Sequence, residues 1–329
     1  MRLISFIILL SVLLPSCRKG EVPNSSGNST DENPVEVKFS SGITATVEEN
    51  PLGRAPIDGE SLLVDSNVGI FGIKAKSSNW NNYTITSSAQ KNLQNAEYQV
   101  YDQGRLYQRY IAEYPTKDSQ FDGLVFYGYY PYMSDVMNYY DFWNDTYYVP
   151  VSLNKNDMSS TPDYLFTGRI NQETPNDDDF ILPLVFKHAL ARIKFTFNRT
   201  TSDVNVDGIV VSADCSVEGK MLISTGEAIP DDTSTQLYRY FINKNLNSDE
   251  QVIADFLLFP GAKVNFIQCI IDSKTYPLYV GTNLEEIKLE QGKVINITIN
   301  FSPKEANFSG ILQGWEDNGE NQDVNIEEK

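Results

Sequence analysis

The chain has 329 residues, 41% of them hydrophobic and 12% aromatic, which is enough apolar content for one large core or two ordinary ones. This composition excludes a disordered protein. The formal net charge is −18, whereas binding to a phosphate backbone requires clustered Lys and Arg, so nucleic acid is excluded as a partner.

The first 17 residues, "MRLISFIILLSVLLPSC", have the pattern of a secretory signal peptide. Basic Arg2 precedes an apolar run that ends at Leu14 and is too short for a membrane-spanning helix. The segment ends in Leu-Pro-Ser-Cys17, which resembles a bacterial lipobox, whose cysteine is lipidated and becomes the new N-terminus. The alternative is an ordinary signal peptide with an incidental cysteine. We expect a protein of the outer membrane or cell surface, held by a lipid on Cys17.

A flexible spacer and a one-sided strand follow the signal. Residues 18–36 are polar and rich in Ser, Asn, Gly and Pro, which predicts a linker that does not fold. The stretch "VEVKFSSGITATV" (35–47) then alternates, and this predicts a long strand with one apolar face. After it comes a turn-rich loop, "EENPLGRAPIDGE", with Arg54 at its middle. The apolar face of the strand comprises Val35, Val37, Phe39, Ile43, Ala45 and Val47.

An aromatic stretch, "FYGYYPY" (126–132), places apolar or aromatic side chains on both faces of a predicted strand. This pattern is typical of a strand covered on both sides, so we interpret the rings as mainly structural. The following segment, residues 132–148, is more polar and turn-like and is the better candidate for an adhesion surface that stacks on sugar rings. The candidate residues are Tyr139, Tyr140, Trp143 and Tyr147.

Period-two alternation recurs along the rest of the chain, for example in "ARIKFTFN" and "VINITINF". No window of a dozen residues has convincing helical periodicity. The sequence therefore predicts an all-β protein built of two antiparallel β-sandwiches. The polar stretch 171–179 is the expected boundary, which gives an N-terminal domain at 37–178 and a C-terminal domain at 179–329 with an acidic tail.

The residues give little support for catalysis or for a cofactor. His188 is the only histidine, and neither a G-x-S-x-G motif nor a Walker loop occurs. We interpret His188 as a structural residue at a strand edge and predict that the protein is not an enzyme and carries no cofactor.

One segment has the oxygen spacing of a calcium loop. Asp203, Asn205, Asp207 and Gly208 occupy its first, third, fifth and sixth places, and Asp214 the twelfth. The flanking residues read as strands rather than as the helices of an EF-hand. We therefore favour a turn between strands and predict no metal site, while calcium binding by residues 203–214 stays open.

Two cysteines, Cys215 and Cys269, remain after the signal. Both lie in strand-like apolar surroundings. They would either pair in an oxidising compartment or stay as buried thiols, and the sequence does not choose.

Several segments in a shared order resemble the fimbrillin family, the Mfa-like and FimA-like pilins of Bacteroidales. The resemblance implies two transthyretin-like β-sandwich domains and assembly into a type V pilus. The segments follow the lipoprotein signal and the arginine loop, and they are "VGIFGI", "FYGYYPY", "PDYLF", "LVFKHALARIKF", "LEQGKVINITINF" and "ILQGW".

The resemblance also implies a processing step and a partner. A trypsin-like or arginine-specific protease would cut after Arg54 and remove the strand 35–47. The vacated groove would then accept a strand from another fimbrial subunit. The alternative is a permanent edge strand at 35–47 and a solvated Arg54.

The C-terminal end fits a donor strand only in part. The last residues, "EDNGENQDVNIEEK", are acidic and suit an apolar groove poorly, whereas "ANFSGILQGW" offers Phe308, Ile311 and Leu312. A stalk, tip, accessory or anchoring position therefore stays open. A different class of function is a monomeric surface lipoprotein that binds host glycan or protein through residues 132–148.

Overall fold

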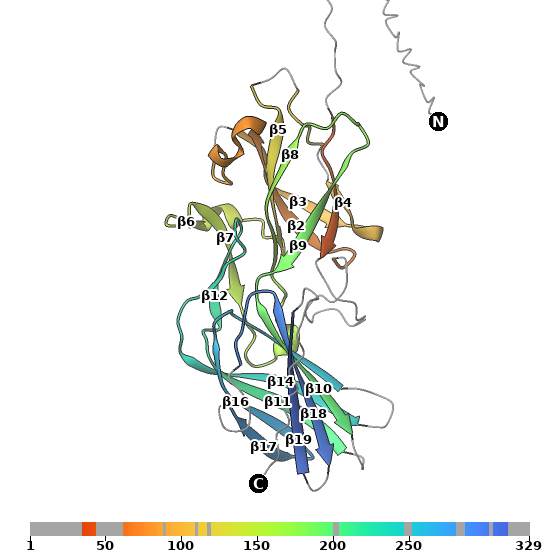
Figure 1. Cartoon of the computed structure of the whole chain (residues 1–329), viewed down its shortest axis with the longest axis vertical. Helices are drawn as coiled ribbons and strands as arrows, with labels where there is room; N and C mark the ends of the chain where they lie inside the picture. The colour runs from red at the N-terminus through yellow and green to blue at the C-terminus, as the bar shows by residue number, and fades with distance from the viewer. Residues whose placement is uncertain are drawn as a thin grey trace, which may run out of the picture. The chain divides into compact units, whose positions relative to one another are not determined.

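The computed structural model describes residues 35–43, 62–87, 90–108, 111–116, 120–199, 204–246, 252–280, 287–302 and 305–314. These residues form strands and short 3-10 helices (Figure 1), which confirms the all-β prediction. Within them, no helix is long and apolar enough to cross a membrane. The helices are η1 (Ser77–Asn82), η3 (Asp102–Gly104), η4 (Val136–Asn138) and η5 (Met158–Ser160). The strands are β1 (Lys38–Ile43), β2 (Asn67–Ala75), β3 (Lys91–Val100), β4 (Arg105–Gln108), β5 (Gly123–Tyr130), β6 (Tyr140–Asp141), β7 (Thr146–Ser152), β8 (Leu165–Glu173), β9 (Ile181–His188), β10 (Ala191–Arg199), β11 (Val204–Asp214), β12 (Glu218–Leu222), β13 (Ala228–Pro230), β14 (Thr235–Leu246), β15 (Val252–Leu258), β16 (Lys263–Ile271), β17 (Lys274–Tyr279), β18 (Lys293–Ser302) and β19 (Glu305–Gly314).

The N-terminal strands form one closed sheet in the order β1-β4-β3-β2-β5-β8-β9. Its interior is an apolar cluster to which every one of these strands contributes. In β5, Leu124 and Phe126 belong to this interior, while Val125, Tyr127 and Tyr129 belong to a second cluster outside the barrel. The aromatic stretch is therefore part of a strand covered on both sides, as predicted, because its two faces serve two different cores.

The barrel extends past the boundary expected at residues 171–179. β8 continues to Glu173, and β9 pairs with β8 on one side and with β1 on the other. The sheet that begins in the proposed N-terminal domain thus ends at His188 rather than at residue 178. Polar and acidic residues mark the β8–β9 connection, and a hairpin connection has the same composition as a linker.

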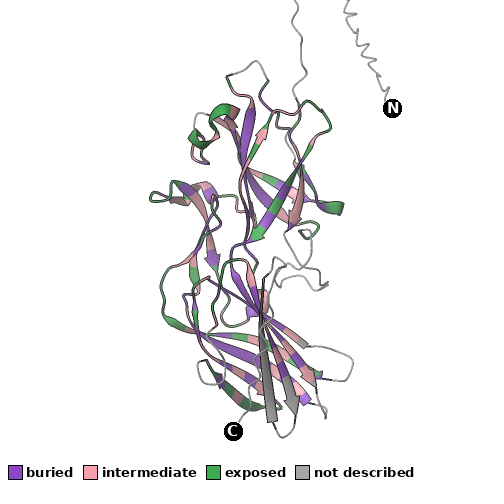
Figure 2. Cartoon of the chain, in the orientation of Figure 1, coloured by how far each residue is buried: buried purple, intermediate pink, exposed green. Residues whose placement is uncertain are grey.

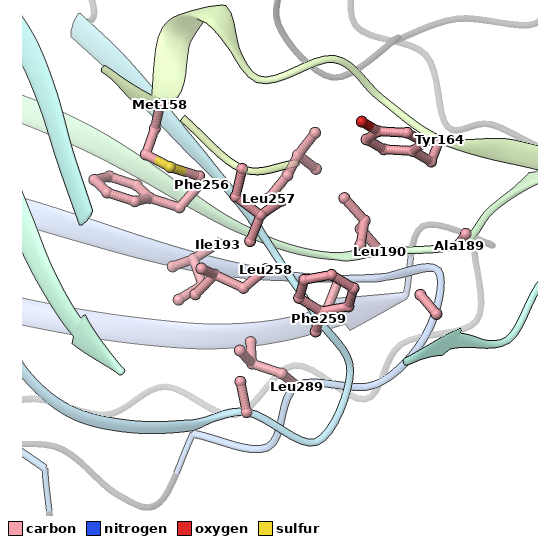
Figure 3. Packing of buried hydrophobic residues seen from close by; sticks show 14 of the residues in the cluster. Met158, Tyr164, Ala189, Leu190, Ile193, Phe256, Leu257, Leu258, Phe259 and Leu289 are labelled. Carbon is pink, nitrogen blue, oxygen red and sulfur yellow. The ribbon is translucent and has the colours of Figure 1, made fainter. Parts of the chain in front are cut away.

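Two four-stranded sheets follow, with the orders β15-β10-β18-β19 and β14-β11-β16-β17. Most of their buried apolar side chains belong to the second cluster, and Figure 3 shows part of it around Leu190, Ile193, Phe256 and Phe259. Most strand pairings are antiparallel, as predicted, but β1 runs parallel to β9 and β10 parallel to β18. Both parallel pairs join strands far apart in the chain, so no hairpin turn fixes their direction.

A third, smaller sheet has the order β13-β12-β7-β6. Its central pairing joins β7 to β12, with Val149 opposite Met221 and Pro150 opposite Lys220. Burial alternates from Tyr148 to the end of β7, and Val149 and Val151 belong to the second cluster. Figure 2 shows the β6–β7 hairpin with buried, intermediate and exposed segments. The sheet thereby fixes the base of the β6–β7 hairpin, whose turn lies between Asp141 and Thr146.

Candidate functional site

The first candidate site is the position of β1, the strand that closes the barrel. β1 pairs in parallel with β9 from Lys38 opposite Ile181 to Ile43 opposite Phe186. On its other side it pairs antiparallel with β4, Phe39 opposite Leu106. β1 therefore has partner strands on both sides, whereas the alternative prediction made it an edge strand. Without β1, the backbone hydrogen-bonding edges of β4 and β9 would be exposed.

The inward face of β1 is apolar, as the alternation predicted for its described residues. Val37, Phe39 and Ile43 are buried in the barrel interior. The Phe39 ring lies edge-on to two others, with centroids 5.2 Å from Tyr98 and 5.1 Å from Phe126. Phe39 thus occupies a pocket lined by aromatic rings, which is the most specific feature of this groove.

Polar contacts hold the two ends of β1. Before it, the Val37 N–H donates to the Ala112 carbonyl at 2.8 Å. At its end, the Ser41 hydroxyl donates to the Gly104 carbonyl at 3.0 Å. Gly104 has φ +70°, and a Cβ added there would lie 2.5 Å from the Ser41 carbonyl oxygen. The groove that holds β1 is therefore narrow beside Gly104, the residue just before β4. Any larger side chain at position 104 would collide with the backbone of β1.

The expected processing site and lipidation site lie outside the described residues. These are Arg54, which follows β1 in the chain, and Cys17. The same holds for residues 44–47 of the predicted strand.

The second candidate site is the turn of the β6–β7 hairpin. Trp143 is 96% exposed and Phe142 83% exposed, more than any other large apolar side chain among the described residues. Of the predicted adhesion residues only Trp143 is exposed, whereas Tyr139, Tyr140 and Tyr147 are half-buried. Sequence reasoning missed Phe142, although its place beside Trp143 in the turn was a usable signal.

The buried Asp141 carboxylate holds this turn in place. One of its oxygens accepts hydrogen bonds from the N–H groups of Trp143 and Asn144, both at 3.0 Å. The other oxygen lies 2.6 Å from Nζ of Lys220 on β12. This ammonium also lies 5.5 Å from the centroid of the Tyr148 ring. The turn is therefore tied to a neighbouring strand by a charged contact.

These contacts predict a pH dependence of the turn. Lys220, with help from the Asn144 N–H, holds the pKa of the Asp141 carboxyl below its ordinary value of 3.8. Because the folded pKa is lowered, the carboxylate stabilises the turn fully above pH 3.8, and this contribution is lost as pH falls through the lowered pKa. We expect the amide NMR shifts of Trp143 and Asn144 to stay constant from pH 7 down to about 4 and to move only below that.

A substitution provides the control for this pH dependence. Lys220→Met removes the ammonium and should move the transition of both amides to higher pH, whereas Lys187→Met, at an exposed position of β9, should leave it unchanged. Equal titration curves for the Lys220→Met protein and the parent protein would contradict this account of the turn.

Two other features singled out in the sequence, His188 and the calcium-like segment, lie in strands of the fold. His188 is buried, and its Nδ1 lies 2.9 Å from Oδ2 of Asp163. The calcium-like segment is neither a loop nor the expected turn, since residues 204–214 form β11 with a bulge between Val206 and Gly208. Asp207 and Asp214 are seven positions apart along the strand, about 23 Å, which is too far for both to bind one ion. Among the described residues, no group of His, Cys, Asp and Glu could hold a metal.

Cys215 and Cys269 are buried free thiols. Cys269 is the register partner of Ile209 in β11. Cys215 lies six positions after Ile209, about 20 Å along the chain, which is too far from Cys269 for a disulfide. Burial raises the pKa of both thiols, so they behave as small apolar side chains.

The comparisons with known proteins agree with this architecture. The model of a family described as fimbrillin-like matches residues 54–327. The crystal structure of a proposed cell adhesion protein from Bacteroides ovatus ATCC 8483 has a TM-score of 0.60 and 17% identity, and the match covers 86% of this chain and 99% of that chain. A proposed cell adhesion protein from Bacteroides uniformis ATCC 8492 has a TM-score of 0.59 and 14% identity, with 85% and 99% covered. At these identities the two structures show a shared fold alone. No curated protein matches the chain.

Proposed function

The chain belongs to the fimbrillin-like family, and from this premise we propose that it is a structural subunit of a cell-surface fimbria assembled by strand exchange. The family match begins at residue 54, so β1 lies outside the matched part of the chain. The protein, on this proposal, is exported through its signal peptide, lipidated at Cys17 and placed on the outer membrane. Cleavage after Arg54 then separates β1 from the rest of the fold.

The observation that carries the proposal is the position of β1. A single short strand closes the barrel and contacts its neighbours on both sides. Its loss would expose two strand edges and the pocket between Tyr98 and Phe126. Such a groove binds an extended segment, because main-chain hydrogen bonds give affinity and alternate side chains give register.

The chain contains a segment that matches this groove. β1 with the residue before it reads "VKFSSGI" (37–43), and residues 306–312 read "ANFSGIL". On the inward face of the first, positions 37, 39, 41 and 43 are Val, Phe, Ser and Ile. The corresponding positions of the second are Ala, Phe, Gly and Leu. Phe308 would therefore fill the Phe39 pocket, and Gly310 would lie at the narrow point beside Gly104.

The donor segment forms β19, which pairs with β18 alone at the edge of its sheet. Leaving that sheet breaks one strand pairing, and entering the groove of another copy forms two. An edge strand that matches an internal groove favours a polymerising subunit over a terminal one. The acidic residues after 314 need not enter the groove.

Limited proteolysis of the purified precursor tests the proposal. We expect a trypsin-like protease to make a discrete cut after Arg54 under native conditions and the product to form a ladder that resists mild heating in detergent. Arg54→Ala should remain uncut and monomeric, and Phe308→Ala should be cut but stay monomeric. A parent protein that is cut after Arg54 and remains monomeric would refute strand exchange, and absence of a discrete cut after Arg54 would refute the processing site.

A further inference from the structure

The β6–β7 hairpin exposes two adjacent aromatic side chains. Trp143 and Phe142 are 96% and 83% exposed, although a folded chain gains about 1.5–3 kcal/mol by burying a large apolar side chain. Contiguous exposed apolar groups on a soluble protein usually mark a contact surface. Neither ring is needed for the second core, which the hairpin supplies with Val149 and Val151 instead.

The hairpin turn is pre-organised. Besides the contacts of Asp141, the Tyr140 hydroxyl donates to Oδ1 of Asp145 at 2.6 Å, and the Tyr140 ring lies 4.7 Å edge-on from the Phe142 ring. Tyr147 stacks on Phe71 of the barrel at 5.5 Å. A chain of aromatic contacts thus links the turn to the second core. A ligand that binds here pays little to order the protein.

The chemistry around the rings points to a small polar ligand. The exposed turn consists of Phe142, Trp143, Asn144 and Asp145, so an amide and a carboxylate follow the indole in the same turn. A pyranose ring presents an apolar C–H face that stacks on an aromatic face and hydroxyl groups that bond to such polar side chains.

Two other kinds of partner fit less well. A stable protein interface needs about 800 Å² on each side, far more than a four-residue turn offers. A membrane surface is anionic and attracts clustered Lys and Arg, whereas this turn carries a carboxylate on a chain of net charge −18.

We propose that the tip of the β6–β7 hairpin, residues 142–145, is a carbohydrate-binding site in which Trp143 stacks on a neutral sugar ring. This site deepens the adhesive part of the proposed function. It is present in the uncleaved chain and does not depend on strand exchange, so the two proposals can fail separately.

A glycan array probed with the Arg54→Ala precursor, which should remain a monomer, tests the site. The array carries neutral oligosaccharides ending in galactose, glucose, mannose or N-acetylhexosamine, together with sialylated counterparts. We expect binding to at least one neutral glycan and weaker binding to its sialylated form, because the added carboxylate would be repelled by the negative charge of Asp145. Titration with the bound oligosaccharide should change the fluorescence of Trp143.

Matched substitutions decide the outcome. Trp143→Ala should lower affinity for that glycan at least about tenfold, because the stacking platform is lost. The affinity of Trp143→Phe should lie between those of the parent protein and Trp143→Ala. Tyr107→Ala removes an exposed ring of β4 and should bind the glycan as tightly as the parent protein. The proposal would be overturned if no neutral glycan bound, or if Trp143→Ala kept the affinity of the parent protein. Binding of the precursor only to phospholipid vesicles or only to proteins without glycans would overturn it as well.

Discussion

Phe39→Ala should lower the free energy of unfolding by about 3–5 kcal/mol, the cost of removing a buried aromatic ring and leaving a cavity. Phe39 is 2% exposed and makes edge-on contacts with Tyr98 and Phe126, so the cavity would lie at the centre of the barrel interior. Guanidinium unfolding followed by circular dichroism measures this loss.

Ser40→Ala provides the control, because Ser40 lies on the same strand with its side chain only partly buried. It should change stability by no more than about 0.5 kcal/mol. A loss below about 1 kcal/mol in Phe39→Ala would mean that β1 contributes little to the barrel, and the proposed groove would then lack its main pocket.

Asp255→Ala should destabilise the protein by about 3–5 kcal/mol, because it leaves the buried Arg192 guanidinium without its carboxylate. Nε of Arg192 lies 2.7 Å from Oδ1 of Asp255, with side chains 3% and 2% exposed. In the C-terminal sheets this pair joins β10 to its neighbour β15. Thermal unfolding at neutral pH measures the loss.

Two further variants separate the buried charge from the lost contact. The double replacement Arg192→Met with Asp255→Leu should recover much of the stability, because both charges of this buried pair are then replaced by apolar side chains. The Asp179 side chain is 97% exposed, and its carboxylate lies 3.5 Å from Nζ of Lys38. Asp179→Ala should therefore lower the free energy of unfolding by less than about 1 kcal/mol. Equal losses in the single and double variants would contradict the expected cost of burying the Arg192 guanidinium without the Asp255 carboxylate.

Local alternation predicted the strands of this fold well. The stretch 35–43 alternates in sequence, and Val37, Phe39 and Ile43 are the residues that the structure buries. Alternation reports which face is covered, because side chains on a strand point to opposite faces in turn. Alternation does not report which strand is the partner, so the parallel pairing of β1 with β9 could not be predicted from the sequence.

Turn signals were less reliable. Asp207-Gly208 was interpreted as a turn, yet both residues lie in β11 at a bulge, where Asp207 accepts a hydrogen bond from the Ser273 N–H at 2.7 Å. Asp-Gly is a hairpin-turn signal but also occurs at bulges, and only the neighbouring strands decide between the two. The end of the barrel at His188 was likewise not predictable from local signals, because it is set by the pairing of β9 with β8 and with β1.

The candidate sites were predictable in location and only partly in residues. The segment 132–148 contains the exposed hairpin turn, and Trp143 is its most exposed residue. Tyr139 and Tyr147 have their rings against Tyr148 and Phe71. Which aromatic side chains of a rich segment remain exposed is set by packing against distant strands, and a single sequence carries little of that information.

The most direct test of strand exchange is a disulfide between subunits. Gly42 of β1 is the register partner of Val185 of β9, and residue 311 would take the place of Gly42. Paired positions lie about 4.8 Å apart between strands, within the reach of a disulfide. Val185→Cys and Ile311→Cys are therefore combined in one chain. Cys215 and Cys269 are buried and should not interfere.

Oxidation after cleavage at Arg54 should yield a ladder of disulfide-linked subunits on a non-reducing gel. The same pair in an Arg54→Ala background should remain monomeric. Val185→Cys with Leu312→Cys, displaced by one residue onto the inward face, should also give no ladder. Absence of a ladder from the cleaved Val185→Cys, Ile311→Cys protein would contradict the placement of residues 306–312 in the groove of β1.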